Sequence, residues 1–313
     1  MKRGQPFAGP SVCYSGYRQG QSPVERVYPS LAQIREDLHL LRPRFCNLRL
    51  YDCSLHAERV LQVLREDALP FRVLLGAALG AEASNPGCAW GGVHDADTLA
   101  ANVAENEAEI GRLVALAARH ADKVAAVAVG NETTPDWTDH LVPVERMRHH
   151  LHRVRRAVAQ PVTFCENYVP WLDRLEGVVP ELDFISVHSY PQWEHHGVAT
   201  AMAHTEANLA AVARRWPGVP LVLSEAGWCT ASHGRGIPPA HASPDLQARH
   251  LHELSHWARD TGTPTFLFEA FDEPWKGSLD PLEPEKHWGL YTVDRRPKPA
   301  LAALASCAEV QPR

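Results

Sequence analysis

The feature that most constrains the fold of this sequence is an eightfold alternation of short apolar stretches with longer amphipathic ones. The apolar stretches are rich in β-branched and aromatic residues, as β-strands are, and each ends in polar or aromatic residues. The predicted strands are residues 11–17, 44–52, 71–79, 124–132, 161–167, 183–190, 220–228 and 264–271. Strands that are apolar along their whole length are typical of a parallel sheet covered by helices.

The amphipathic stretches predict the covering helices. They span residues 31–41, 58–67, 99–121, 144–159, 201–216 and 245–260. Ser30 is a good N-cap, Pro143 is expected in a first turn, and Ser243-Pro244 pairs a cap with a first-turn proline, while Gly262 ends the last helix. We therefore predict one (β/α)₈ TIM barrel over residues 1–313. A doubly wound open sheet is the alternative, but "GYRQGQSP" after the first strand is not a G-x-G-x-x-G turn.

Composition excludes several function classes. The net charge of −6 gives no basic surface for nucleic acid, and no apolar run approaches the roughly 20 residues of a membrane span. Residues 1–10 contain no signal-like apolar stretch, so a cytoplasmic location is expected, or a periplasmic or secreted one if a leader has been removed. The seven cysteines are odd in number, and we expect buried, unpaired thiols in a reducing compartment.

Carboxylates and aromatic residues gather at the predicted strand ends, where a barrel of this class builds its active site. The polar and aromatic residues there are Tyr14, Tyr17, Arg49, Tyr51, Asp52, Asn131, Glu132, Glu166, Asn167, His188, Tyr190, Glu225, Glu269 and Glu273. Seven of the nine tryptophans also fall at or after strand ends. Indoles offer apolar faces that suit the C–H faces of pyranose rings, so this combination favours a polysaccharide substrate.

Two of these carboxylates fit glycosidic bond cleavage. Glu132 ends the fourth strand and Glu225 the seventh, so they can face each other across the barrel mouth. A separation of about 5–5.5 Å would make the reaction retaining. We expect Arg49 and Tyr190 to support an ionised Glu225 and Asn131 to hold a sugar hydroxyl. Gly227 would let the chain turn, and Trp228 would form either a wall for the sugar or packing behind it.

The ordered motifs resemble those of glycoside hydrolase family 17, the β-1,3-glucanase family. They are "RLYD" (49–52), "VGNE" (129–132), "HSYP" (188–191), "SEAGW" (224–228), "FDEPWK" (271–276) and "EKHWGLY" (285–291). The opening "YSGYRQGQSP" is closer to bacterial members than to plant ones.

The resemblance implies a retaining hydrolase or glucanosyltransferase acting on β-1,3-glucan, without cofactor or metal, with Glu132 as acid/base and Glu225 as nucleophile. It also implies an auxiliary charged cluster of Glu273, Lys276 and Glu285. The substrate-binding or supporting residues predicted in all are Arg49, Tyr51, Asn131, Glu166, His188, Tyr190, Trp228, Glu273, Lys276 and Glu285. The motifs "EAGWCT" and "FDEPWK" depart from the plant pattern.

Two further functions compete with this interpretation. "HELSH" (252–256) matches the H-E-x-x-H zinc-peptidase motif, but we expect its helix on the outer ring, away from the barrel mouth. A non-catalytic glucan-binding barrel is the other alternative, and the presence of both glutamates argues against it. Residues 229–244, rich in Gly, Pro and His, are expected to shape one end of the groove. Oligomeric state has no signal in the sequence.

Overall fold

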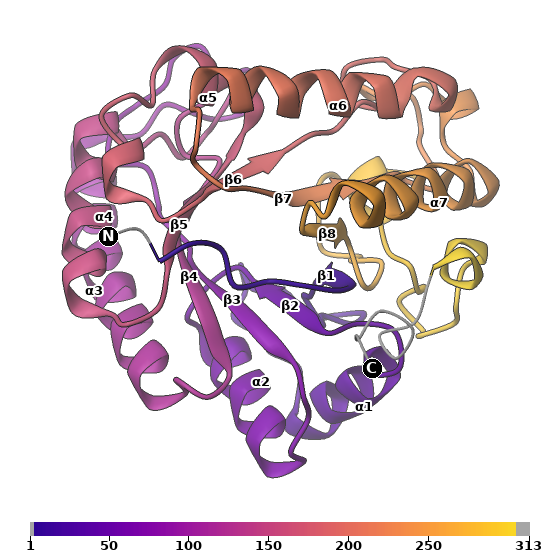
Figure 1. The fold of residues 1–313 in the computed structure, drawn as a ribbon, viewed down its shortest axis with the longest axis horizontal. Helices are drawn as coiled ribbons and strands as arrows, with labels where there is room; N and C mark the ends of the chain where they lie inside the picture. Colours follow the sequence, from indigo (N-terminus) through magenta and orange to yellow (C-terminus); the bar gives the residue numbers. More distant parts are fainter. Residues whose placement is uncertain (1–2, 305–313) are drawn as a thin grey trace.

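The computed structural model describes residues 3–304 and has the predicted closed barrel (Figure 1). Eight parallel strands follow one another in sequence order, and β8 pairs with β1 to close the cylinder. The strands are β1 (Ser11–Cys13), β2 (Asn47–Leu50), β3 (Arg72–Ala77), β4 (Val124–Asn131), β5 (Val162–Asn167), β6 (Ile185–His188), β7 (Leu221–Gly227) and β8 (Thr265–Phe268). Each lies inside its predicted range, so the (β/α)₈ prediction is confirmed.

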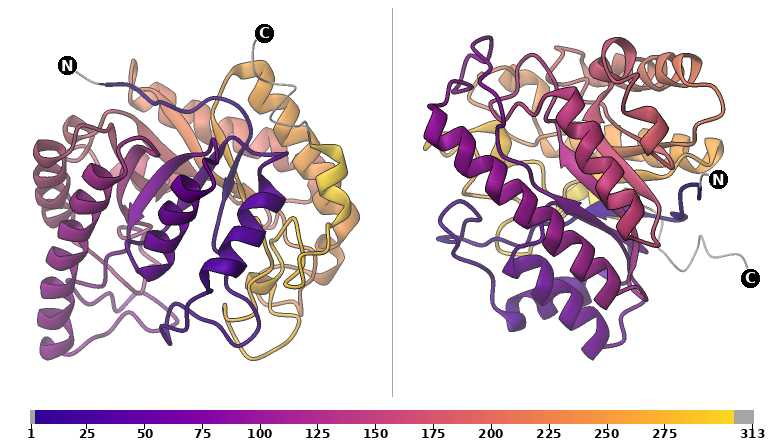
Figure 2. Two further views of the ribbon diagram at one scale, coloured as in Figure 1. Left: turned by 90° about the horizontal axis from the view of Figure 1, so that it is seen from below. Right: turned by 90° about the vertical axis from the view of Figure 1, so that its left-hand side faces the viewer.

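Helices cover the outside of the barrel, as two further views make clear (Figure 2). They are α1 (Leu31–Leu41), α2 (Leu55–Glu66), α3 (Ala96–Arg119), α4 (Val144–Ala157), α5 (Tyr168–Asp173), α6 (Val198–Arg215) and α7 (Pro244–Thr261). The predicted caps are present at Ser30, which forms a capping box, and at Ser243, while Gly262 ends α7 with φ of 68°. Pro143 is the N-cap of α4, one position before the first turn in which we expected it.

Short helical turns complete the chain. They are η1 (Val179–Glu181), η2 (Pro239–His241), η3 (Pro284–Lys286) and η4 (Pro299–Ala303). Helix α5 was not predicted, because a six-residue segment with Pro170 at its centre carries no helical periodicity. After β8, among the described residues, η4 takes the place of a full eighth helix and packs against α7.

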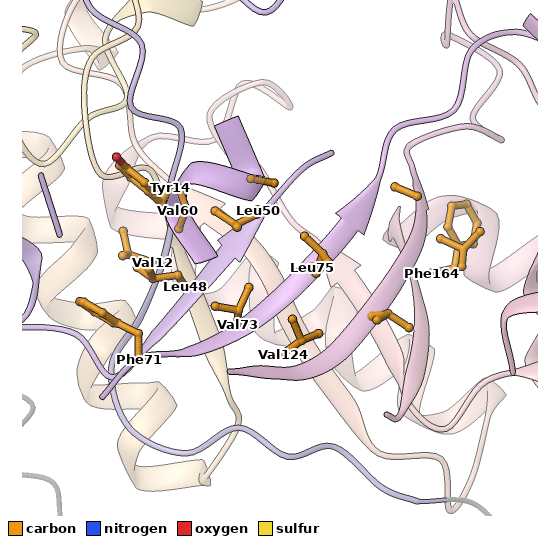
Figure 3. Close-up of a cluster of buried hydrophobic side chains, with 14 of the residues drawn as sticks. Val12, Tyr14, Leu48, Leu50, Val60, Phe71, Val73, Leu75, Val124 and Phe164 are labelled. Carbon is orange, nitrogen blue, oxygen red and sulfur yellow. The ribbon is translucent and has the colours of Figure 1, made fainter. Parts of the chain in front are cut away.

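The core has two layers. The larger one lies between the barrel and its helices, and Figure 3 shows part of it, with Val12, Leu48 and Val73 on neighbouring strands and Val60 on α2. The smaller one fills the barrel interior; its residues include Cys13, Leu74, Ala126, Cys165, Phe184, Val222 and Phe266. Because the interior is filled, the polar strand ends above it stand on a rigid base.

The cysteine prediction is right at five positions and wrong at one. Buried free thiols occur at Cys13, Cys53, Cys88, Cys165 and Cys229. Cys46 is disulfide-bonded, which the odd count and the lack of paired spacing gave no reason to expect. Cys307 lies outside the described residues. No helix within residues 3–304 has the length and apolarity that a bilayer crossing requires.

Candidate active site

A cleft of about 990 Å³ opens over the C-terminal ends of the strands. Loops that follow strands all around the barrel contribute to its walls. Eight of the sequence-predicted site residues line it: Tyr51, Asn131, Glu132, Tyr190, Glu225, Glu273, Lys276 and Glu285. The strand-end argument therefore located the cleft correctly.

Glu225 projects from β7 into a nearly closed cage of donors. It is 5% exposed, and Arg49 forms an ion pair with its Oε1. The Tyr51 hydroxyl donates to the same oxygen at 3.0 Å, and the Tyr190 hydroxyl donates to Oε2 at 2.5 Å. Both carboxylate oxygens are thus satisfied by donors at the end of β2 and just after β6, which hold the group in one orientation.

This cage keeps Glu225 ionised. Burial would raise the pKa of Glu225, but the charges of His188 and Arg49 and the hydroxyls of Tyr190 and Tyr51 outweigh it and lower the pKa to about 2. An anionic carboxylate at the floor of the cleft is the form that a nucleophile requires.

Glu132 stands on an irregular strand end. The register between β4 and β5 shifts between Ala128 and Asn131, and Gly130 has φ of 80°. A side chain at Gly130 would be strained at that φ and would press on Met147 Cε, 3.0 Å from an added Cβ. Glu132 itself has φ of 48°. This bulge turns two consecutive residues, Asn131 and Glu132, toward the cleft, whereas a regular strand would direct only one of them there.

His188 lies between the two glutamates. Its Nδ1 is 2.8 Å from Glu132 Oε1 and 3.6 Å from Glu225 Oε2, so those two oxygens are at most 6.4 Å apart, the sum of the two distances. Burial would lower the pKa of His188, but the charge of Glu225 and hydrogen bonds with Cys165 and Glu132 raise it to about 10. The side chain of Glu132 is 29% exposed and that of Glu225 is 6% exposed, so the first glutamate is the more accessible.

Arg49 also orients Asn131. Its Nη2 donates to the side-chain oxygen of Asn131, and a guanidinium can only donate. The amide nitrogen of Asn131 is therefore left to face the cleft that this residue lines. One cation thus sets the orientation of a carboxylate on β7 and of an amide donor on β4.

Glu166 lies beneath the cleft. It is fully buried, and its carboxyl accepts hydrogen bonds from the backbone and hydroxyl of Thr134 at 3.0 and 2.7 Å and from the backbone of Asn167 at 2.6 Å. Burial and the charge of Glu132 raise the pKa of Glu166 to about 8, although these hydrogen bonds oppose the shift. Glu166 supports the loop that follows Glu132 and does not line the cleft.

The predicted charged cluster forms at the end of β8. Lys276 Nζ lies 2.9 Å from Glu269 and 2.7 Å from Glu273. Glu285 lines the cleft beside them; burial raises its pKa to about 7, although the charge of Lys276 acts in the opposite direction. Glu273, Lys276 and Glu285 line the same cleft as Glu225, so the structure brings the predicted charged cluster to the predicted site.

Some of the predicted tryptophans line the cleft and others lie away from it. The cleft is lined by Trp90, Trp137, Trp193, Trp275 and Trp288. Trp228 is fully buried; its indole donates to His241 O at 2.8 Å and its ring packs near His250. Of its two proposed roles, packing behind the strand is therefore the one that the structure supports. Trp171 is likewise buried in α5 and not at the cleft.

Gly227 has a different role from the one we expected. An added Cβ would lie 2.0 Å from Phe268 O on β8, so the glycine is required by the close approach of two strand ends and not by a turn. Sequence reasoning also missed His56, Tyr168 and Val169 as cleft residues. Tyr168 and Val169 could have been found from Asn167, which ends β5 and is the N-cap of α5, because residues that directly follow a strand end reach the cleft.

The loop from Cys229 to Ser243 reaches the cleft as expected. Arg235 and Gly236 line one wall, and Arg235 pairs with Glu283 at 3.4 Å. The "HELSH" segment lies on α7 in the outer layer, where His252 and His256 are exposed. Within residues 3–304 no group of three His, Cys, Asp or Glu side chains is arranged to hold a metal ion.

Residues 11–289 match the BtgE/BtgC glycoside hydrolase domain, and the chain belongs to this family. A glucan 1,3-β-glucosidase of Schizosaccharomyces pombe is 28% identical over 176 residues, 52% of this chain and 53% of that protein. A glucan 1,3-β-glucosidase of Arthroderma benhamiae is 25% identical over 284 residues, 85% of this chain and 83% of that protein. The chain thus aligns with about half the length of the first relative.

Solved structures share the fold. A mutant β-1,3-glucanosyltransferase of Rhizomucor miehei in complex with laminaritriose has a TM-score of 0.74 at 21% identity, with 96% of this chain and 98% of that chain covered. An endo-laminarinase from Formosa Hel1_33_131 has a TM-score of 0.74 at 24% identity, with 91% and 84% covered. At these identities the similarity shows a shared fold alone.

Proposed function

We propose that this member of the BtgE/BtgC glycoside hydrolase domain family cleaves β-1,3-glucan with retention of configuration, with Glu225 as nucleophile and Glu132 as acid/base. The observation that carries the proposal is the cage around Glu225, in which Arg49, Tyr51 and Tyr190 hold a buried carboxylate in its ionised form. The names of the two curated relatives support the substrate class.

The spacing of the two glutamates supports retention. Inverting enzymes separate their carboxyl groups by roughly 6.5–9.5 Å to admit a water molecule, and retaining ones by about 5–5.5 Å. The upper limit of 6.4 Å between Glu132 Oε1 and Glu225 Oε2 favours the retaining arrangement.

The reaction has two steps. Protonated Glu132 gives its proton to the glycosidic oxygen while a Glu225 oxygen bonds to the anomeric carbon, so the leaving sugar departs and an ester forms. Glu132, now a carboxylate, then takes a proton from water or from a sugar hydroxyl. The oxygen of this water or hydroxyl bonds to the anomeric carbon, and the ester bond to Glu225 breaks. The Asn131 amide donates to a hydroxyl of the sugar at the reaction centre, and this bond strengthens as positive charge develops.

The acceptor in the second step distinguishes a hydrolase from a glucanosyltransferase. Incubation with β-1,3-linked oligosaccharides of defined length, followed by chromatography of the products, tests both. Shorter products alone indicate hydrolysis, and products longer than the substrate indicate transfer. Absence of any new product from wild-type protein would contradict the proposal.

Azide rescue tests the two residue roles. An Ala substitution of Glu225 should lower kcat by on the order of 10⁴ or more, and azide should restore cleavage of an activated aryl glucoside as the α-glycosyl azide. Glu132→Ala should still form the glycosyl ester from the same aryl glucoside, whose leaving group needs no proton, but should hydrolyse the ester slowly, and azide should release it as the β-glycosyl azide. The same azide anomer from both variants would overturn the assignment.

A further inference from the structure

Two tryptophans on neighbouring loops are the only exposed ones among residues 3–304. Trp90, after β3, is 57% exposed, and Trp137, after β4, is 38% exposed, and both line the cleft. Neither indole nitrogen has a hydrogen-bond partner in the described part of the chain, whereas those of Trp171, Trp216, Trp228 and Trp275 do. Large apolar faces left open beside a reaction centre mark a binding surface.

The loop that carries Trp90 is held in place, so this exposure does not come from a loose segment. At its base, Ser84 Oγ accepts from the backbone of His94 and donates to its carbonyl, both at 3.0 Å. Asn85 N donates to Gly92 O at 2.6 Å and closes the loop around Trp90. The loop thus has its own internal framework.

The same loop is tied to the loop that carries Trp137. The side-chain amide of Asn85 donates to Asp136 O at 2.9 Å and to Thr138 O at 2.8 Å, the two residues that flank Trp137. A second tie joins His94 Nε2 to Asp139 O at 2.8 Å. These bonds join the two loops that carry the cleft-lining indoles, and we call this pair of loops and their indoles the Trp90–Trp137 wall.

The wall lies on the side of the cleft where the leaving group departs. Trp137 follows Glu132 by five residues on the same loop, and the acid/base must contact the oxygen of the departing sugar. The nucleophile Glu225 comes from β7, and the charged cluster around Lys276 follows β8. Sugar units beyond the scissile bond on the Glu132 side therefore extend toward the two indoles.

We propose that the Trp90–Trp137 wall binds glucose units of the leaving chain, or of an incoming acceptor chain, and makes activity depend on chain length on that side. Asn85 is a positioning residue that keeps the two indoles together. This inference rests on the proposed function and adds a specificity-determining surface to it. Stacking of apolar sugar faces on two open indoles supplies the affinity.

Two substrates distinguish binding of the leaving or acceptor chain from a general role in catalysis or folding. A β-1,3-linked heptasaccharide can occupy the wall, whereas the nitrophenyl β-glycoside of laminaribiose has no sugar beyond the scissile bond. Trp90→Ala and Trp137→Ala should each raise KM for the heptasaccharide about tenfold, while kcat/KM for the nitrophenyl glycoside stays within about twofold of wild type. Asn85→Asp, which loses the amide donor at constant size, should raise KM for the heptasaccharide alone.

Control variants in the same loop complete the experiment. Trp90→Phe keeps an aromatic face, so its KM for the heptasaccharide should lie between those of wild type and Trp90→Ala. It replaces the alanine variant in the experiment if that variant folds poorly. Val93→Ala removes another exposed apolar side chain of this loop and should match wild type on both substrates. Equal losses on both substrates, or no change on either, would overturn the inference while the proposed function stands. Failure of wild-type protein to cleave either substrate would overturn both.

Discussion

Two buried carboxyl groups near the barrel mouth, Glu225 on β7 and Glu166 on β5, have pKa values that are shifted in opposite directions. Both project from strand ends, with 5% and 0% exposure, and both accept three or more hydrogen bonds or ion pairs. Interactions lower the pKa of Glu225 to about 2, whereas burial and the charge of Glu132 raise the pKa of Glu166 to about 8.

The difference lies in the charge of the neighbours and not in depth. Burial raises the pKa of both groups, since a charge loses hydration wherever it is buried. Glu225 faces the cations Arg49 and His188, while Glu166 meets only neutral donors and the negative charge of Glu132. Burial alone therefore favours the neutral carboxyl group, and a cation in contact with it favours the ionised form that the proposed mechanism needs.

Removing Arg49, the cation that also orients Asn131, should bring the pKa of Glu225 closer to that of Glu166 and have the largest effect on activity. Arg49→Met should lower kcat/KM for β-1,3-linked oligosaccharides by on the order of 10³ or more, because the pKa of Glu225 rises and Asn131 loses its orientation. Steady-state kinetics at constant pH measures this. Arg49→Lys keeps the charge but not the two-pronged contact and should be intermediate. A loss below tenfold for Arg49→Met would show that the cation is dispensable.

The hydroxyls around Glu225 offer a matched pair of smaller changes. Tyr190→Phe removes a 2.5 Å bond to Oε2 and should lower kcat/KM by about 10- to 100-fold, as expected for a hydrogen bond to a charged group. Tyr51→Phe removes a 3.0 Å bond to Oε1, which Arg49 also contacts, and should cost less. The kinetics of both variants on one substrate give the ranking, and the reverse order would contradict this account of the cage.

Much of this site could be predicted from the sequence because strand ends of a parallel barrel converge at one mouth. Arg49 on β2 and Tyr51 directly after it lie two positions apart, so they were expected on one side, and both indeed contact Glu225. The same period of two places Trp228 on the side opposite to Gly227 and Glu225, and that side packs against α7. The burial of Trp228 could therefore have been predicted from the sequence.

Other features have no local signal. The bulge at Gly130 breaks the period of two and brings both Asn131 and Glu132 to the cleft, and only the left-handed φ of the glycine explains it. The tie between Asn85 and the loop of Trp137 joins residues 51 and 53 positions apart in the chain. Such long-range contacts depend on how loops meet in space, which the pattern of one segment does not encode.

His188 allows the role of the second cation to be separated from that of Arg49. His188→Gln removes a charge that lowers the pKa of Glu225, so this pKa should rise by on the order of one unit while Arg49 stays in place. Since the proposed mechanism needs Glu225 in its anionic form, the acidic limb of the profile of kcat/KM against pH should move to higher pH by the same amount. An unchanged acidic limb with a reduced kcat would mean that His188 acts on Glu132 and not on the pKa of Glu225.

Glu166→Gln should have the smallest effect on activity and a diagnostic effect on stability. The folded pKa of about 8 lies above the unfolded value near 4.5, so the folded state holds an extra proton between these pH values. The free energy of unfolding of wild type should therefore fall as pH rises through this window, by up to roughly 1.4 kcal/mol per pH unit, and Glu166→Gln should lack that contribution. For Glu225 the folded pKa is lowered, so its contribution is present above pH 4.5 and is lost as pH falls toward 2.

Urea unfolding of wild type, Glu166→Gln and Glu225→Gln at pH 3.5, 5.5 and 7.5 tests both signs at once. Relative to wild type, the first variant should gain stability between pH 5.5 and 7.5, while kcat/KM stays within about threefold because its carboxyl does not line the cleft. The second should be most destabilised at pH 5.5 and 7.5 and less destabilised at pH 3.5, where part of the contribution of Glu225 has been lost. If both differences had the same pH dependence, neighbouring charge would not distinguish these two carboxyl groups, and the ionised state of Glu225 would need another cause.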